Sequence, residues 1–127
     1  MEPNRARKIV RDKIPALLDA ATRQKNPTFY SLDEINPAEQ LKLIVEKLEE
    51  EVEEVCYLFR KGGRIVIGKL LEEIADVTAV LDLIRKRMNL TVDDVNKAAV
   101  KKLDRNGGFT VPVVMEYDEI QDFEEKI

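Results

Sequence analysis

The sequence predicts an all-α fold, an antiparallel helical bundle of about four helices with a short extended C-terminal tail. Apolar side chains recur at helical spacing through two long stretches, Leu41–Phe59 and Ile67–Ile84. The chain of 127 residues has five glycines and five prolines, which leaves room for long helices and short connections. We expect residues 1–127 to form a single domain, as is typical of this length.

The first predicted helix begins near Asp12, which is a suitable N-cap, and carries Pro15 in its first turn. It is expected to run to about Arg23. A polar loop from Gln24 to about Asn36 follows it.

The second predicted helix has the clearest start signal of the chain. Asn36 is the expected cap, Pro37 takes the first helical position, and Glu39 stands three residues after the cap. The consecutive residues Gly62 and Gly63 end this helix.

The remaining elements follow at short intervals. A third helix is predicted over about Ile65–Met88, with cations at 85–87 that suit the negative end of the helix dipole. Thr91 provides the cap for a fourth helix over about Val92–Asp104. The segment 109–115 is rich in β-branched residues, and we expect it to be extended.

Composition excludes several classes of function. The net charge of −4 and a pI near 5.0 argue against nucleic acid as a partner. The chain has no histidine, which excludes histidine acid–base catalysis and zinc sites with histidine ligands. A lone cysteine, Cys56, forbids an intramolecular disulfide and suits a reducing compartment. No apolar run suggests a membrane span, so we expect a cytoplasmic protein.

Acidic residues gather in both long helices, and a helical wheel separates them. Glu73 and Asp76 fall within the broad apolar arc of the third helix. A carboxylate on such an arc must be paired with a cation, bound to a metal or protonated. Glu51 borders the apolar face of the second helix, whereas Glu54 lies farther round and Glu50 is nearly opposite. A solvated acidic face is the alternative for these residues.

Two facing pairs of carboxylates at i,i+3 spacing would repel each other unless a cation lay between them. Hard divalent cations prefer oxygen ligands, and Mg²⁺ commonly combines a few carboxylates with substrate phosphates. A basic row in the fourth helix, which includes Lys101 and Arg105, is either solvated surface or a phosphate-binding element.

The order of motifs resembles that of the all-α nucleoside triphosphate pyrophosphatases, the MazG-like and phosphoribosyl-ATP pyrophosphohydrolase-like proteins. Glu50-Glu51-Val52-Glu53-Glu54 and Glu73-Ile74-Ala75-Asp76 match their Glu-Glu-x-x-Glu and Glu-x-x-Asp signature. The leader 8–15 and the segment 101–109 are similar to the ends of a small single-domain branch. In this chain Asn106 interrupts the usual Arg-Gly-Gly-Phe.

This resemblance implies hydrolysis of a nucleoside triphosphate between the α- and β-phosphates, for nucleotide-pool house-cleaning. It implies Mg²⁺ as cofactor, with Mn²⁺ as an alternative, and a homodimer or homotetramer. The implied roles are catalysis for Glu50 and Glu51, metal binding for Glu51, Glu54, Glu73 and Asp76, and phosphate binding for Lys101, Arg105, Arg11 and Lys13.

Two other functions remain open at this stage. The same chemistry could act on phosphoribosyl-ATP, which the metal motif does not distinguish from other substrates. A non-catalytic helical oligomer is the alternative from a different class, and it predicts no specific stabilisation by divalent metal.

Overall fold

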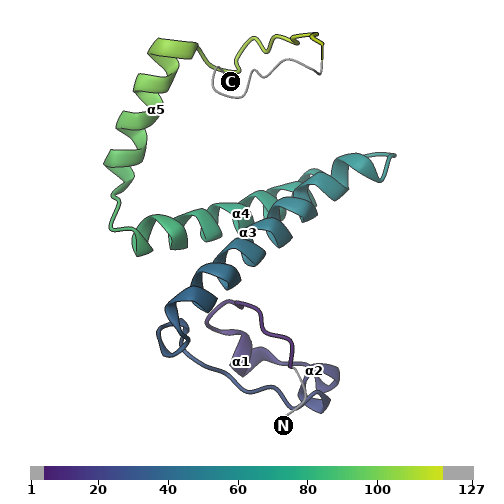
Figure 1. Ribbon diagram of the computed structural model, residues 1–127. Helices are drawn as coiled ribbons and strands as arrows, with labels where there is room; N and C mark the ends of the chain where they lie inside the picture. The colour runs from purple at the N-terminus through teal and green to yellow at the C-terminus, as the bar shows by residue number, and fades with distance from the viewer. Residues whose placement is uncertain (1–4, 119–127) are drawn as a thin grey trace. The chain divides into compact units, whose positions relative to one another are not determined.

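The computed structural model describes residues 5–118, and within this range every regular element is helical. The all-α class predicted from the sequence is therefore confirmed for the described part of the chain. The elements are α1 (Ile14–Leu17), α2 (Ala20–Gln24), the 3-10 helix η1 (Leu32–Glu34), α3 (Pro37–Arg60), α4 (Ile67–Arg87) and α5 (Val92–Asn106). Figure 1 labels the α-helices along the ribbon.

The chain divides into two compact units, Met1–Asn89 and Leu90–Ile127. The first contains α1 to α4 and the second contains α5. That residues 1–127 form a single domain stays a prediction.

The single first helix predicted from Asp12 to about Arg23 is wrong, because the structure has two short helices there. Lys13 is the N-cap of α1, and Leu18 after it is extended, with ψ of 135°. The Asp19 side chain then accepts a hydrogen bond of 2.7 Å from the backbone N–H of Thr22 and caps α2. This local bond offers the backbone an alternative to continuing the helix.

The long helix α3 begins where the sequence predicts. The Asn36 side chain accepts a hydrogen bond of 2.9 Å from the backbone N–H of Glu39, and Pro37 takes the first position. Pro37 costs nothing there because the first helical N–H groups have no partner within the helix. The cap thus fixes where the apolar and acidic positions of α3 begin.

Gly62 and Gly63 separate α3 from α4, and both have positive φ, 74° and 79°. Side chains other than glycine rarely adopt this region, which explains why two glycines stand at the turn. Helix α4 returns antiparallel to α3, so the two form a helical hairpin (Figure 1). It begins at Ile67, two residues later than predicted. The four-helix arrangement of the prediction is not established by this pair.

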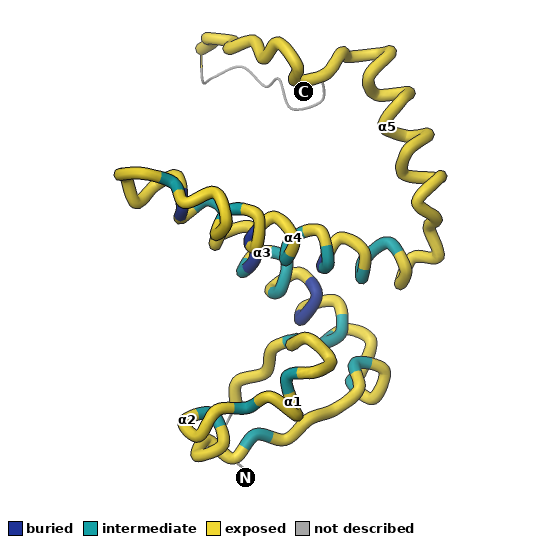
Figure 2. Tube along the Cα trace, turned by 180° about the vertical axis from the view of Figure 1, so that it is seen from behind, coloured by how far each residue is buried: buried dark blue, intermediate teal, exposed yellow. Residues whose placement is uncertain are grey.

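The buried residues of the first unit lie where α3 faces α4 (Figure 2). Among the described residues four hydrophobic side chains are buried, Leu43, Ile44 and Leu58 from α3 and Val80 from α4. Many other apolar side chains of the hairpin remain exposed. The core of the described hairpin is therefore narrow, and it lies directly beside the acidic residues.

Three ion pairs tie the segment before α1 to the hairpin. The Arg7 guanidinium donates to Glu39 at 2.8 Å, and the Lys8 ammonium donates to Glu50 at 2.9 Å. Arg11 reaches α4, where it donates to Asp76 at 2.5 Å. Exposed pairs of this kind contribute little stability each, but together they fix the course of the segment.

Helix α5 of the second unit has a complete capping box. The Thr91 side chain accepts from the backbone N–H of Asp94 at 3.0 Å, and the Asp94 side chain accepts from the backbone N–H of Thr91 at 2.8 Å. The helix extends to Asn106, two residues beyond the prediction, and Gly107 with φ of 76° ends it. Residues 109–118 contain no helix or strand.

None of the helices in the described range 5–118 combines the length and apolar character that a membrane crossing requires.

Candidate metal centre

The α3–α4 hairpin brings four carboxylates together. Glu51 and Glu54 are one helical turn apart on α3, and Glu73 and Asp76 are one turn apart on α4. Side chains at i and i+3 share a face, so each helix presents a pair. One oxygen from each of the four groups lies within 4.8 Å of the others. These are the four metal-binding residues implied by the sequence motifs, and the cluster can hold a metal ion.

Two of the four carboxylates are buried between the helices. Glu51 is 7% exposed and Glu73 is 3% exposed, whereas Asp76 is half-buried and Glu54 is exposed. The Oε2 atoms of Glu51 and Glu73 are both buried, and neither accepts a hydrogen bond from a lysine, an arginine or a backbone N–H of the described residues. Buried carboxylate oxygens without a donor are costly, and a bound cation is one way to satisfy them.

The other oxygen of each buried carboxylate accepts from a lysine one turn earlier on the same helix. The Lys47 ammonium lies 2.9 Å from Glu51 Oε1, and the Lys69 ammonium lies 2.7 Å from Glu73 Oε1. Burial disfavours the charged form of Lys47, but hydrogen bonds to Glu51 and Glu50 outweigh it and raise its pKa. Both lysines therefore stay charged as internal counter-ions.

The negative charges of Asp76 and Glu54 are compensated without a lysine of the same helix. Arg11 bonds Asp76, which places this predicted phosphate-binding residue at the edge of the cluster. A hydrogen bond with Glu73, burial and the charge of Glu51 raise the pKa of Glu54 to about 7. Hydrogen bonds from Lys69 and then from Glu54 lower the pKa of Glu73. Glu54 is therefore the carboxyl group of the cluster that is most readily protonated near neutral pH.

Glu50 lies outside the group of four. Its carboxylate bonds Lys8 at 2.9 Å and approaches Lys47 at 3.5 Å. The hydrogen bond from Lys8 is the main cause of its lowered pKa. The predicted catalytic role of Glu50 stays a prediction, but its surroundings make it a weak base.

The other predicted phosphate-binding residues are on the surface. Lys13 is exposed at the start of α1, and it forms no ion pair with a described residue. Lys101 and Arg105 are exposed on α5 of the second unit, where the Arg105 guanidinium donates to Asn106 at 3.0 Å. Their contribution to a phosphate site stays a prediction.

An open cavity of about 480 Å³ adjoins the cluster between α3 and α4. Glu54 and Glu73 belong to both the cavity and the cluster, and Tyr57, Lys61 and Lys69 contribute other parts of its wall. The cavity is a wide-open depression on the surface and not an enclosed pocket. A ligand in this cavity would meet the carboxylates from one side.

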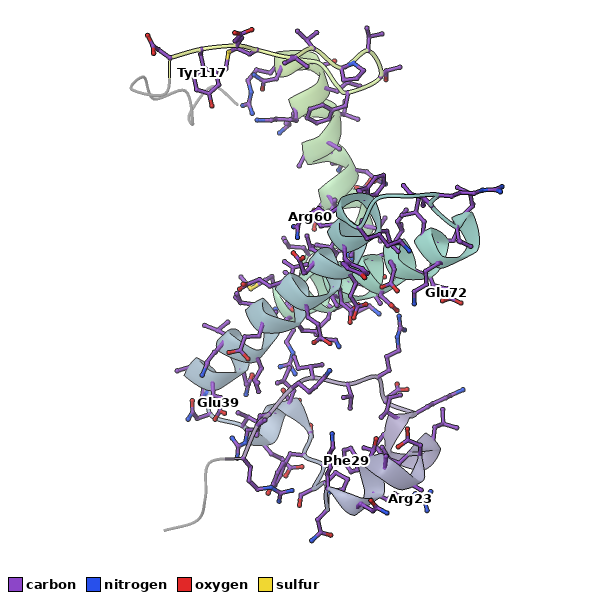
Figure 3. The ribbon with its side chains drawn as sticks, turned by 90° about the vertical axis from the view of Figure 1, so that its right-hand side faces the viewer. Arg23, Phe29, Glu39, Arg60, Glu72 and Tyr117 are labelled. Carbon is purple, nitrogen blue, oxygen red and sulfur yellow. The ribbon has the colours of Figure 1, made fainter. Side chains whose placement is uncertain are left out.

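Lys47 and Lys69 were not among the site residues predicted from the sequence. Both stand four residues before a cluster glutamate, a spacing that places them on the same helix face. That spacing was the available signal. Glu72, which is three residues after Lys69, instead extends from α4 to solvent (Figure 3).

Comparisons with models of protein families, with curated proteins and with solved structures gave no match. The resemblance to the all-α pyrophosphatases therefore rests on the motifs in the sequence. Membership of that group stays a prediction.

Proposed function

We propose that the protein is a MazG-like nucleoside triphosphate pyrophosphohydrolase that uses Mg²⁺. Water would add to the α-phosphorus, the α–β anhydride bond would break, and the products would be a nucleoside monophosphate and pyrophosphate. The observation that carries this proposal is a cluster of four acids in which two carboxylate oxygens, Glu51 Oε2 and Glu73 Oε2, are buried without a lysine, arginine or backbone N–H donor. An oxygen-rich site of this kind suits Mg²⁺ and phosphate chemistry.

The four carboxylates of the proposal hold the ion from both helices of the hairpin: Glu51, Glu54, Glu73 and Asp76. When bound, Mg²⁺ would neutralise phosphate oxygens and make a bound water more acidic, and Mn²⁺ would serve in the same way. Glu54, whose pKa is about 7 in the metal-free protein, releases its proton when it becomes a ligand.

Glu51 carries the larger part of the catalytic role that we propose for Glu50 and Glu51. It is buried, and it faces the other three acids. Glu50 acts by positioning, because it shares Lys47 with Glu51 and so helps to fix the ammonium that holds Glu51. Glu50→Gln should consequently reduce activity less than Glu51→Gln.

Arg11 is the best-supported phosphate-binding residue of the four predicted from the sequence, because it already contacts Asp76. A cation in the cluster would replace Arg11 as the counter-charge of Asp76. The guanidinium would then be available to phosphate oxygens, which it matches in geometry. Lys13, Lys101 and Arg105 remain in the proposal as further phosphate ligands.

The direct test is pyrophosphate release from a panel of ordinary and modified nucleoside triphosphates and phosphoribosyl-ATP, with Mg²⁺, Mn²⁺ or EDTA. Asp76→Asn is the test variant. Glu49→Asn is the control, because Glu49 is an exposed acid of α3 outside the cluster.

Release that requires the metal and disappears in Asp76→Asn would support the proposal, and the preferred compound would identify the substrate. A folded Asp76→Asn protein with full activity would refute it. No release from any compound would favour the non-catalytic oligomer.

We also propose a homodimer or homotetramer in which a second hairpin completes an antiparallel four-helix bundle. Apolar stripes on α3 and α4 remain exposed, including Leu41, Val45 and Val52 on α3 and Ile67, Ile74 and Leu81 on α4. The stripes meet around an apolar cavity of about 210 Å³ that Val52 and Ile74 help to line. Two such hairpins would bury these stripes against each other.

A further inference from the structure

The cavity beside the four carboxylates has a mixed charge that the metal site alone does not explain. Glu53, Glu54 and Glu73 form its acidic side, and Lys61 and Lys69 contribute two ammonium groups. Glu53 already binds the guanidinium of Arg60, so it does not compete for these lysines. A site for a bare cation needs no lysines in its wall. A site for a cation together with an anion needs both, because the anion binds the metal on one side and donors on the other.

Lys69 differs from Lys47 in a way that matters for binding. The Lys47 side chain is 14% exposed and contacts both Glu50 and Glu51, so it is held within the protein. The Lys69 side chain is 55% exposed and lines the cavity. Its short contact is to Glu73 Oε1, and an ammonium has three N–H donors. Lys69 can therefore keep Glu73 and still donate to a ligand.

Lys61 and Tyr57 extend the same wall. Lys61 follows the last residue of α3, is exposed, and forms no ion pair with a described residue. Tyr57 stands one turn earlier and is also exposed, so its hydroxyl is available as a donor. Lys69, Lys61 and Tyr57 together provide donors for a negatively charged ligand, along a wall that begins at the acidic cluster.

We propose that Lys69 and Lys61 bind the phosphates of the metal-bound substrate in this cavity, with the Tyr57 hydroxyl as a further donor. The ligand class is a polyphosphate that shares its oxygens with the ion held by the four carboxylates. This inference rests on the proposed function for the presence of the ion. It adds three substrate-binding residues that the motifs do not contain.

The test is calorimetric titration with Mg²⁺ alone, and then with pyrophosphate at saturating Mg²⁺. Wild type, Lys69→Met and Lys61→Met are compared with Lys42→Met, which removes an exposed lysine of α3 paired with Glu46 and outside the cavity. We expect each cavity variant to raise the dissociation constant of pyrophosphate about tenfold or more, as loss of a charge-assisted hydrogen bond does. Lys42→Met should not change it.

The Mg²⁺ titration distinguishes two possible roles of Lys69, binding of phosphate and positioning of Glu73. If Lys69 binds phosphate, Lys69→Met should keep the Mg²⁺ affinity of wild type or increase it, because a competitor for Glu73 is gone. Loss of Mg²⁺ affinity in Lys69→Met would show that this lysine positions Glu73, and would overturn its phosphate role. Lys61→Met lies at an exposed helix end, so folding does not limit that comparison.

Two further outcomes overturn the inference without touching the proposed function. One is pyrophosphate affinity unchanged in both cavity variants. The other is a wild-type protein that binds Mg²⁺ but no pyrophosphate. The proposed function is tested separately, by pyrophosphate release from nucleoside triphosphates with the wild-type protein.

Discussion

Glu51 and Glu73 carry the metal chemistry at the scale of single residues. In each, one carboxylate oxygen accepts a hydrogen bond from a lysine, and the other oxygen is buried without a lysine, arginine or backbone N–H donor. A ligand that binds the native state stabilises it by about 2.7 kcal/mol at a concentration of 100 Kd. We expect Mg²⁺ to raise the free energy of unfolding of the wild-type protein by this amount. Glu73→Gln should lose most of the gain, because an amide is a poor ligand for Mg²⁺.

Thermal unfolding with Mg²⁺ and with EDTA measures this effect. Glu49→Gln is the matched control, since it removes one carboxylate from an exposed position of α3 and should keep the full gain. Equal stabilisation of Glu73→Gln and wild type would mean that the cluster does not bind the ion.

Glu54 is expected to make the stability of the metal-free protein depend on pH between about 4.5 and 7. Its pKa in the folded protein, about 7, lies above the ordinary value of 4.5, so folding favours its protonated form. Its contribution to stability is therefore present below pH 4.5 and is lost as the pH rises from about 4.5 to 7. No histidine titrates in this window, because the chain has none.

The measurement is denaturant unfolding of metal-free protein at several pH values from 5 to 7.5. The free energy of unfolding should fall with pH in wild type and stay flatter in Glu54→Gln. Saturating Mg²⁺ should reverse the trend, because the ion competes with the proton. Parallel curves for the two metal-free proteins would exclude Glu54 as the titrating group.

The hairpin is the element that makes the site, and its turn depends on two glycines. A Cβ at Gly63 would meet no atom within 4 Å, so the cost of a side chain there is backbone strain alone. Since φ is 79°, Gly63→Ala should cost about 1–2 kcal/mol. Gly68 lies within α4, where a Cβ also meets nothing and φ is not positive. Gly68→Ala should instead be stabilising, by up to about 1 kcal/mol.

Denaturant unfolding at a fixed Mg²⁺ concentration measures both effects. The free energy of unfolding should be lower than wild type in Gly63→Ala and higher in Gly68→Ala. Stabilisation by Gly63→Ala would show that the turn does not need a left-handed residue.

The sequence predicted the long helices better than the short ones. The Asn36 cap fixed the start of α3, and Thr91 that of α5, because these side chains bond the first free N–H groups directly. The division between α1 and α2 was missed, since the same kind of bond from Asp19 is also compatible with an uninterrupted helix. A capping residue therefore predicts a helix start where apolar residues at helical spacing follow it. Where they do not follow, the same residue does not distinguish a helix start from a helix interior.

The exposed apolar stripes belong to the scale of the whole molecule. If a second copy covers them, a charge placed among them should separate the copies, since burying an unpaired ammonium is costly. Val52→Lys and Ile74→Lys should each give a monomer, because both positions line the apolar cavity. Glu72→Lys, on an exposed position outside that cavity, should leave the assembly unchanged.

Sedimentation equilibrium of the three variants and wild type measures the assembly directly. A monomeric wild-type protein would contradict the proposed dimer or tetramer, and oligomeric lysine variants would place its interface elsewhere.

The resemblance to the all-α pyrophosphatases named Glu51, Glu54, Glu73 and Asp76 as a metal-binding set. The sequence by itself determined the helical class and the two acidic pairs. It could do so because helical periodicity and i,i+3 spacing are properties of a single helix. Only the tertiary structure decided that the four carboxylates meet and that Glu51 and Glu73 are buried between the helices. It also decided that the pKa of Glu54 is raised to about 7 and that Lys69 lines a cavity beside the cluster. These properties depend on how α3 packs on α4, because the burial of Glu51 and Glu73 and the coupling of Glu54 to Glu73 arise between the two helices.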